Sequence, residues 1–99
     1  MSRRLARQVA FQTLFQIDLA NSDVETALEQ RLDDAALDVD NQEYVKEVVR
    51  GVMQKLPALD AQISAVSKGW QVHRLGFVDR NILRLAIYEI VFMDEIPVR

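Results

Sequence analysis

The chain contains no cysteine and only one histidine, His73. The absence of cysteine excludes a disulfide framework and thiolate metal sites, and a single histidine cannot form a histidine-based zinc site. The three glycines are far apart in the sequence, so no glycine-rich phosphate-binding loop is present. We therefore expect no metal, no cofactor and no catalytic residues.

Long apolar stretches are also missing. No run approaches the ~20 residues that a membrane-spanning helix needs, so we expect a cytoplasmic protein with no membrane contact. Apolar residues make up 49% of the 99 residues and charged residues 27%, as in ordinary globular proteins. This length suits one modest core, and we predict that residues 1–99 form a single domain.

Proline and glycine are scarce, and no segment shows the alternating pattern of a strand. Apolar residues recur at helical spacing instead, which predicts an all-α fold. The expected helices cover about residues 4–20, a segment starting at the Ser22–Glu25 capping box, a segment from Asp40 or Asn41 to Leu56, a segment ending near Gly69, and about residues 78–92. Pro57 either kinks the third helix or begins the fourth.

The last expected helix looks central because its apolar residues form a wide face. That face consists of Ile82, Leu83, Ala86, Ile87 and Ile90, with Leu85 and Phe92 at its edges. Arg80, Arg84 and Tyr88 interrupt the apolar pattern one turn apart. We expect these polar side chains to bond to one another or to neighbouring helices.

Charge is distributed unevenly, although the net charge is only −3. Residues 1–17 carry three arginines and no acid, residues 18–47 carry ten acids and two bases, and residues 48–99 carry seven bases and five acids. Arg3, Arg4 and Arg7 gather at the start of the first helix, where cations oppose the helix macrodipole. Guanidinium groups suit phosphate, so the spacing alone leaves phosphate binding and a solvated leader equally open.

Gln8, Gln12 and Gln16 continue this row along the same helix. Their amides offer donors and acceptors for bases, but a solvated face is the simpler interpretation. Three phosphate contacts on single-stranded RNA would give a salt slope of only about −2. Nucleic-acid binding by this chain would therefore need help from stacking or from a second protein.

Three segments of the sequence resemble the NusB family of bacterial transcription antitermination factors. They are "ARQVAFQTLFQIDL", "YVKEVVRGVMQKLPALDAQI" and the most specific one, "DRNILRLAIYE" from Asp79 to Glu89. Together with the closing "EIPVR" they cover nearly the whole chain. The resemblance implies a compact helical bundle of two small helical subdomains.

The resemblance also implies a function. NusB-like proteins bind boxA-type single-stranded RNA of ribosomal RNA transcripts together with NusE, a small-subunit ribosomal protein. The pair joins the antitermination complex on RNA polymerase. The residues that this resemblance assigns to RNA are Arg3, Arg4, Arg7, Gln12 and Gln16, the two glutamines less directly. It assigns Asp79, at the start of the last helix, to contact with NusE.

One departure from the family pattern matters. Family members continue past the "IPV" element, so we expect the second subdomain to be incomplete. If the chain ends at Arg99, the last helix should expose an apolar patch, and stability should fall. Self-association would follow from such a patch, and some NusB-like proteins are dimers, so homodimerisation stays open.

Two other functions remain open at this point. Ribosomal RNA cytosine methyltransferases carry a related NusB-like RNA-binding domain at their N-terminus, although the "SRRLAR" and "VDRNILRLAIYE" segments look closer to the free-standing protein. A helical scaffold with no RNA role is the second alternative. The scaffold predicts that replacing all three N-terminal arginines changes nothing but solubility.

Overall fold

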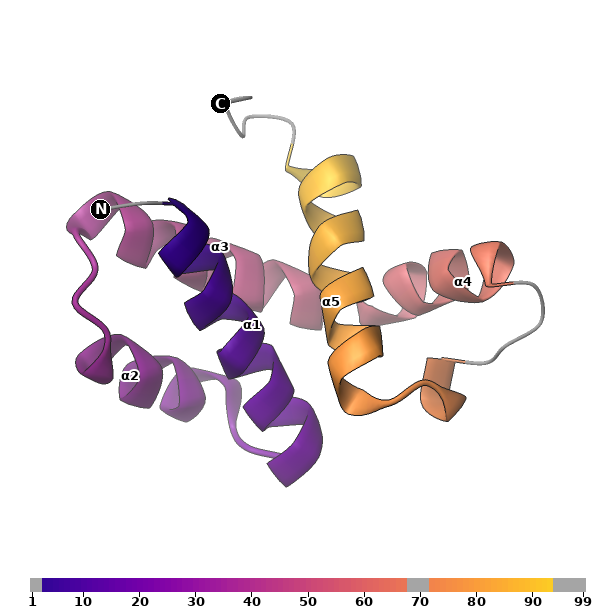
Figure 1. The fold of residues 1–99 in the computed structure, drawn as a ribbon, viewed down its shortest axis with the longest axis horizontal. Coiled ribbons are helices and arrows are strands. Elements are labelled where there is room, and N and C mark those ends of the chain that lie inside the picture. The colour runs from indigo at the N-terminus through magenta and orange to yellow at the C-terminus, as the bar shows by residue number, and fades with distance from the viewer. Residues whose placement is uncertain (1–2, 68–71, 94–99) are drawn as a thin grey trace. The chain divides into compact units, whose positions relative to one another are not determined.

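The computed structural model describes residues 3–67 and 72–93, and all regular structure within them is helical, as the sequence predicts. The elements are α1 (Arg3–Ala20), α2 (Val24–Asp34), α3 (Val39–Gln54), α4 (Leu56–Val66), the 3-10 turn η1 (Val72–Arg74), α5 (Phe77–Ile87) and the π-helical turn η2 (Tyr88–Phe92) (Figure 1). The expected cap Gly69 lies outside the described residues. Within those residues, no helix combines the length and apolarity needed to cross a membrane.

Aspartates cap the starts of α2 and α3. The Asp23 carboxylate accepts hydrogen bonds of 3.0 Å from both the backbone amide and the hydroxyl of Thr26. The hydrogen bond from the backbone amide lowers the pKa of Asp23 most. Asp38 accepts a 2.9 Å bond from the Asn41 amide. The predicted caps at Ser22 and at Asp40 or Asn41 are therefore wrong. In each case a nearby carboxylate, which the helix dipole favours, reaches the free amides instead.

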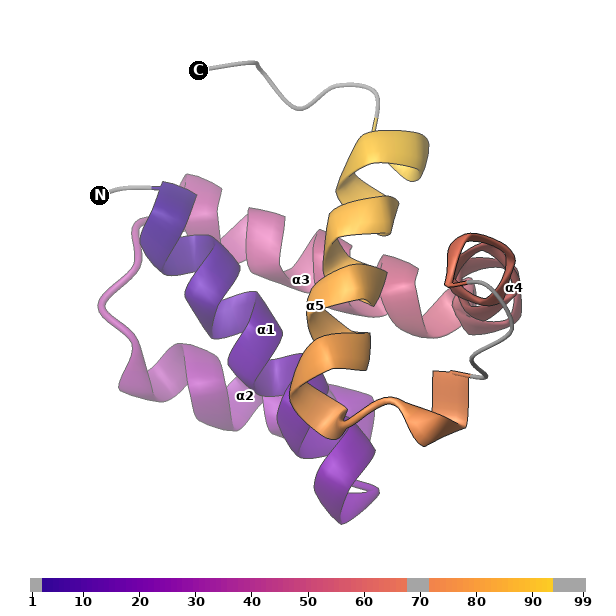
Figure 2. The same cartoon turned by 45° about the vertical axis from the view of Figure 1, so that its right-hand side comes forward.

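The chain divides into two compact units, residues 1–50 and residues 51–99. In the first unit α1 and α2 pack together (Figure 2). Glu25 of α2 receives two hydrogen bonds from the Arg50 guanidinium of α3, at 2.7 and 2.9 Å. These bonds lower the pKa of Glu25 and raise that of Arg50. Because both side chains are exposed, salt and water weaken this link.

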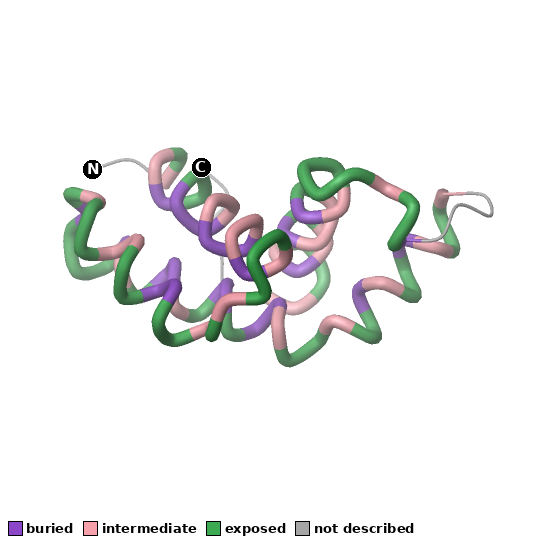
Figure 3. The backbone as a smooth tube through the Cα atoms, turned by 90° about the horizontal axis from the view of Figure 1, so that it is seen from below, coloured by how far each residue is buried: buried purple, intermediate pink, exposed green. Residues whose placement is uncertain are grey.

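Buried residues of the first unit recur at helical spacing, and exposed residues occupy the opposite faces (Figure 3). The buried apolar residues are Ala6, Val9, Ala10, Leu14, Ile17, Ala27, Leu28, Leu37, Tyr44, Val45, Val48 and Val49. Its α3 members, Tyr44, Val45, Val48 and Val49, recur at helical spacing in the sequence. Thr13 is also buried, and its hydroxyl donates to the Val9 carbonyl at 2.8 Å, so no polar group is left unsatisfied there.

The second unit contains the end of α3 together with α4, η1, α5 and η2. Pro57 lies in the first turn of α4. Of the two predicted roles, it therefore begins the fourth helix and does not kink the third. Leu59 and Ile63 of α4 are fully buried. Helix α4 packs against α5, and an ion pair between Asp60 and Arg84 joins the two helices.

Helix α5 buries a different face from the predicted one. The buried residues of α5 and η2 are Asn81, Leu85 and Tyr88, whereas Ile82 is 50% and Ile90 78% exposed. Asn81 tolerates burial because its side-chain amide donates a 2.8 Å hydrogen bond to the Phe77 carbonyl. Several apolar side chains of α5 and η2 are exposed one by one, and the expected apolar patch stays a prediction. They are Phe77, Val78, Ile82, Ile90 and Val91.

Gly51 provides the closest packing in the second unit. A Cβ atom at Gly51 would overlap the ring and hydroxyl of Tyr88, which is 7% exposed. The Tyr88 ring also stacks on Phe92, with 5.8 Å between centroids. The Lys55 ammonium lies 5.1 Å from the centre of the Phe92 ring. The missing side chain at Gly51 therefore permits η2 to pack against the end of α3.

The variant Gly51→Ala tests this packing, because two physical effects predict opposite changes in its free energy of unfolding. Helix propensity alone predicts stabilisation by ~1 kcal/mol, but overlap with a rigid aromatic ring predicts destabilisation by about 1–3 kcal/mol. Urea unfolding measures the free energy directly. Gly76→Ser is the matched control, because a Cβ at Gly76 meets open space and serine suits the N-cap position before α5. A stabilised Gly51→Ala protein would contradict the packing.

Candidate nucleic-acid interface

The three N-terminal arginines occupy the first turns of α1 but differ in burial. Arg3 is half-buried, and Arg4 and Arg7 are exposed. The first turn of α1 contains no acidic residue. Two exposed cations at the positive end of a helix do not stabilise that helix, so their position favours a role in binding an anion.

Arg3 is tied into the first unit. Its guanidinium carbon lies 4.3 Å from the centre of the Tyr44 ring, and Tyr44 is 6% exposed. Its Nη1 atom is buried and has no hydrogen-bond partner among the described residues. This cation–π contact fixes the start of α1 against α3 and removes much of the Arg3 guanidinium from the surface.

The two glutamines proposed to extend this surface are both half-buried. The Gln16 carbonyl oxygen accepts a 2.9 Å bond from Arg31 Nε, and its amide nitrogen donates to Gln30 at 3.2 Å. Gln16 therefore also holds α2 against α1. Its assignment to RNA, like that of Gln12, stays a prediction.

Asp79 is exposed in the first turn of α5, where the helix dipole stabilises a carboxylate. It belongs to the second unit, whereas the RNA-assigned residues all lie on α1 in the first. The proposed contact of Asp79 with NusE also stays a prediction. Its exposure is the property that such a contact needs.

The expected bond from Arg84 to a neighbouring helix is observed, although the sequence did not identify its partner, Asp60 of α4. Arg84 Nε and Nη2 donate to the two carboxylate oxygens of Asp60, at 2.8 and 2.9 Å. The side chains are 11% and 31% exposed, respectively. Paired, partly buried charges of this kind are costly to separate. One signal was available, since Asp60 is the only acid between Arg50 and Asp79 in the sequence.

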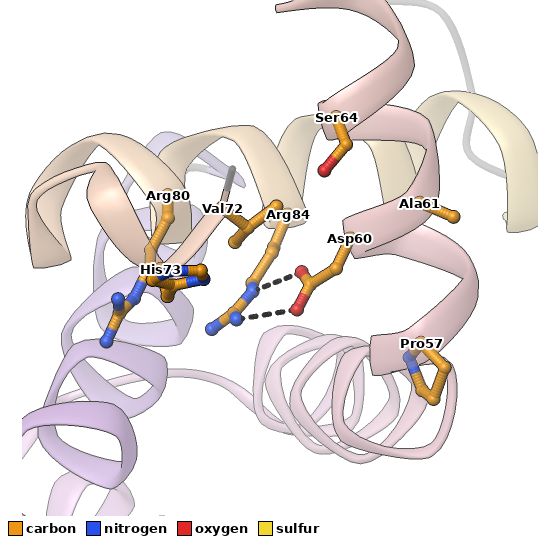
Figure 4. Close-up of a pocket in the computed structure, with 8 residues that line it drawn as sticks. All are labelled: Pro57, Asp60, Ala61, Ser64, Val72, His73, Arg80 and Arg84. Carbon is orange, nitrogen blue, oxygen red and sulfur yellow. Dashed lines mark hydrogen bonds and ion pairs between the residues drawn. The ribbon is translucent and has the colours of Figure 1, made fainter. Parts of the chain in front are cut away.

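His73 and Arg80 line an open hollow of the second unit, of about 550 Å³, together with this ion pair (Figure 4). The remaining lining residues are Pro57, Ala61, Ser64 and Val72. Within the described residues, no group of three or more histidine, aspartate or glutamate side chains is placed to hold a metal ion.

Comparison with known proteins gives consistent matches. The model of the NusB family matches residues 4–99. A transcription antitermination protein NusB from Ruminiclostridium cellulolyticum is 37% identical over 97 residues, which cover 98% of this chain and 67% of that relative.

Two solved structures resemble the fold closely. NusB from T. maritima has a TM-score of 0.88 and 38% identity, over 98% of this chain and 68% of that one. A crystal structure of antitermination factors NusB and NusE in complex with dsRNA has a TM-score of 0.81 and 28% identity, over 91% and 67%. The similarity therefore extends over nearly all of this chain and about two thirds of its relatives.

The different burial of the arginines predicts different effects on stability. Arg3→Ala should lower the free energy of unfolding by about 1–2 kcal/mol, because a partly buried cation–π contact is lost. Arg4→Ala should change it by less than about 0.5 kcal/mol. Urea unfolding of both variants measures the difference. Equal effects would contradict the assignment of Arg3 to the fold.

Proposed function

The chain belongs to the NusB family, and we propose that it is an RNA-binding transcription antitermination factor. It recognises boxA-type RNA of ribosomal RNA transcripts together with NusE. The complex then acts on RNA polymerase to suppress premature termination, in the cytoplasm. The factor is not an enzyme.

The family match over residues 4–99 carries this proposal. A structural neighbour with NusB and NusE on dsRNA supports the choice of partners. The exposed arginines of α1 supply the charge that a phosphate backbone attracts. Relatives that carry the antitermination name cover 98% of this chain, which favours this function over a methyltransferase domain or a scaffold.

We assign the RNA contacts to α1, with a different role for each residue. Arg4 and Arg7 bind phosphate groups through their exposed guanidinium forks. Arg3 contributes charge but mainly holds the helix start on Tyr44. Gln12 and Gln16 lie further along the same helix and are the weaker assignments. Asp79 of α5 is the proposed contact for NusE.

Two exposed arginines are not enough for tight binding. Each phosphate contact on a single strand contributes ~0.7 to the salt slope, so Arg4 and Arg7 together contribute roughly 1.4. NusE must supply further contacts or order the RNA. The proposal therefore includes cooperative binding, with RNA affinity higher in the presence of NusE than in its absence.

Fluorescence anisotropy with a labelled boxA-type RNA tests the proposal. We expect the chain to prefer this RNA to a scrambled strand, and NusE to strengthen binding. In Arg4→Ala/Arg7→Ala the affinity should fall on the order of tenfold per arginine, the equivalent of ~1.4 kcal/mol each. The salt slope should also fall, by roughly 1.4. A duplex of the same sequence shows which form of RNA is bound.

Two control variants separate a phosphate grip from general charge. Lys46→Ala/Lys55→Ala removes the same two charges from elsewhere in the chain and should leave RNA affinity nearly unchanged. Arg4→Lys/Arg7→Lys keeps the charge but loses the planar forks, so it should bind with intermediate affinity. Equal binding of boxA-type and scrambled RNA, with no effect of the Arg4/Arg7 change, would refute the function and leave the scaffold.

A further inference from the structure

The side chain of Arg3 has a buried donor that is not used. Its Nη1 atom is buried and makes no hydrogen bond among the described residues. The contact that holds Arg3 in place is the Tyr44 ring, whose centre lies 4.3 Å from the guanidinium carbon. An aromatic face attracts the positive charge, but it does not replace a hydrogen-bond acceptor for Nη1. Because native proteins satisfy nearly all buried donors, this exception needs a physical explanation.

We propose that Arg3 changes partners when RNA binds: its guanidinium leaves the Tyr44 ring and donates to a phosphate group of the RNA. The inference rests on the proposed function, because the phosphate belongs to the bound boxA-type RNA. It goes beyond that function by giving Arg3 two alternative contacts, one in the free protein and one in the complex.

The position of Arg3 on α1 suits such an exchange. Arg3 directly precedes Arg4 and lies one helical turn before Arg7, and both of these arginines are exposed. An RNA backbone that contacts Arg4 and Arg7 is therefore within reach of the long Arg3 side chain. Rotation of that side chain is enough for the exchange, and α1 itself can stay in place.

The two contacts satisfy the guanidinium to different degrees. On Tyr44 the cation gains the attraction of the ring, but Nη1 has lost its hydrogen bonds to water without replacement. On a phosphate the planar fork makes charge-assisted hydrogen bonds, which are stronger than neutral ones. RNA binding therefore replaces an incompletely satisfied contact with a satisfied one, at the expense of the cation–π contact.

Tyr44 stays in the core during the exchange. It is 6% exposed and belongs to α3, whose buried face forms part of the first unit. The start of α1 is thus tied to α3 in the free protein and to RNA in the complex. The free protein binds RNA more weakly than it would if Arg3 were already released, because the contact with Tyr44 has to be broken first.

The variant Tyr44→Leu tests the exchange, because it removes the ring but keeps an apolar side chain in the core. Arg3 then has no cation–π contact to leave, so affinity for boxA-type RNA in the presence of NusE should rise roughly three- to tenfold. Tyr44→Phe is the matched control, because it keeps the aromatic face and should bind RNA like the unchanged protein. In Arg3→Gln/Tyr44→Leu the gain should disappear, since it depends on the released guanidinium.

Two further measurements do not depend on a substitution in the core. Arg3→Gln alone should lower the RNA salt slope by about 0.7, as loss of one phosphate contact on a single strand predicts. NMR of the unchanged protein follows the exchange directly. Adding RNA should shift the Arg3 Nε signal and the Tyr44 ring signals together, whereas the ring of Tyr88, the only other tyrosine, should be unaffected.

The inference and the proposed function fail in different ways. If Tyr44→Leu binds RNA no better than Tyr44→Phe, and RNA leaves the Tyr44 ring signals unmoved, the exchange is overturned. Arg3 then only holds the fold, while weaker RNA binding by Arg4→Ala/Arg7→Ala keeps the proposed function. If Arg4→Ala/Arg7→Ala also binds like the unchanged protein, and boxA-type and scrambled RNA bind equally, both the function and the exchange are refuted.

Discussion

The buried face of α3 is the constraint on which the rest of the structure depends. Val45, Val48, Val49 and Val52 of this helix are fully buried, and such burial supplies much of the free energy of a small core. The same helix gives each unit a specific contact. In the first unit its Tyr44 supports Arg3, and in the second its Gly51 receives Tyr88.

The arginines of this chain have two different structural roles. Some hold helices together: Arg50 pairs with Glu25, and Arg84 pairs with Asp60. Others are exposed on the surface, as Arg4 is. Sequence composition cannot separate the two kinds, because each is an arginine on a helix. Their contacts separate them, and the proposed function rests on the second kind.

Much of the fold follows from the sequence because it depends on local periodicity. The helix order and the buried face of α3 could be predicted, since Tyr44, Val45 and Val48 repeat at helical spacing. The buried face of α5 could not. A hydrophobicity pattern ranks Ile82 above Asn81, but the asparagine amide is satisfied by the Phe77 carbonyl and can be buried.

The sequence indicates where the candidate site lies along the chain but not which contacts its side chains make. The cluster at the start of α1 is visible in the sequence, yet the stacking of Arg3 on Tyr44 joins residues 41 positions apart. The open hollow beside the Asp60–Arg84 pair is harder still to predict, because it combines residues of α4, η1 and α5. No spacing rule connects Asp60 with Arg84 or His73 with Arg80. Such long-range groupings depend on packing, which local patterns do not contain.

The most direct test of the central claim is an amide NMR map of the chain with boxA-type RNA and NusE. The account predicts the largest RNA-dependent shifts at the start of α1, around Arg4 and Arg7, and small ones at the acidic end of α2, around Asp33. A scrambled RNA should give weaker shifts at the same positions. Shifts centred away from α1, or equal for both RNAs, would contradict the account.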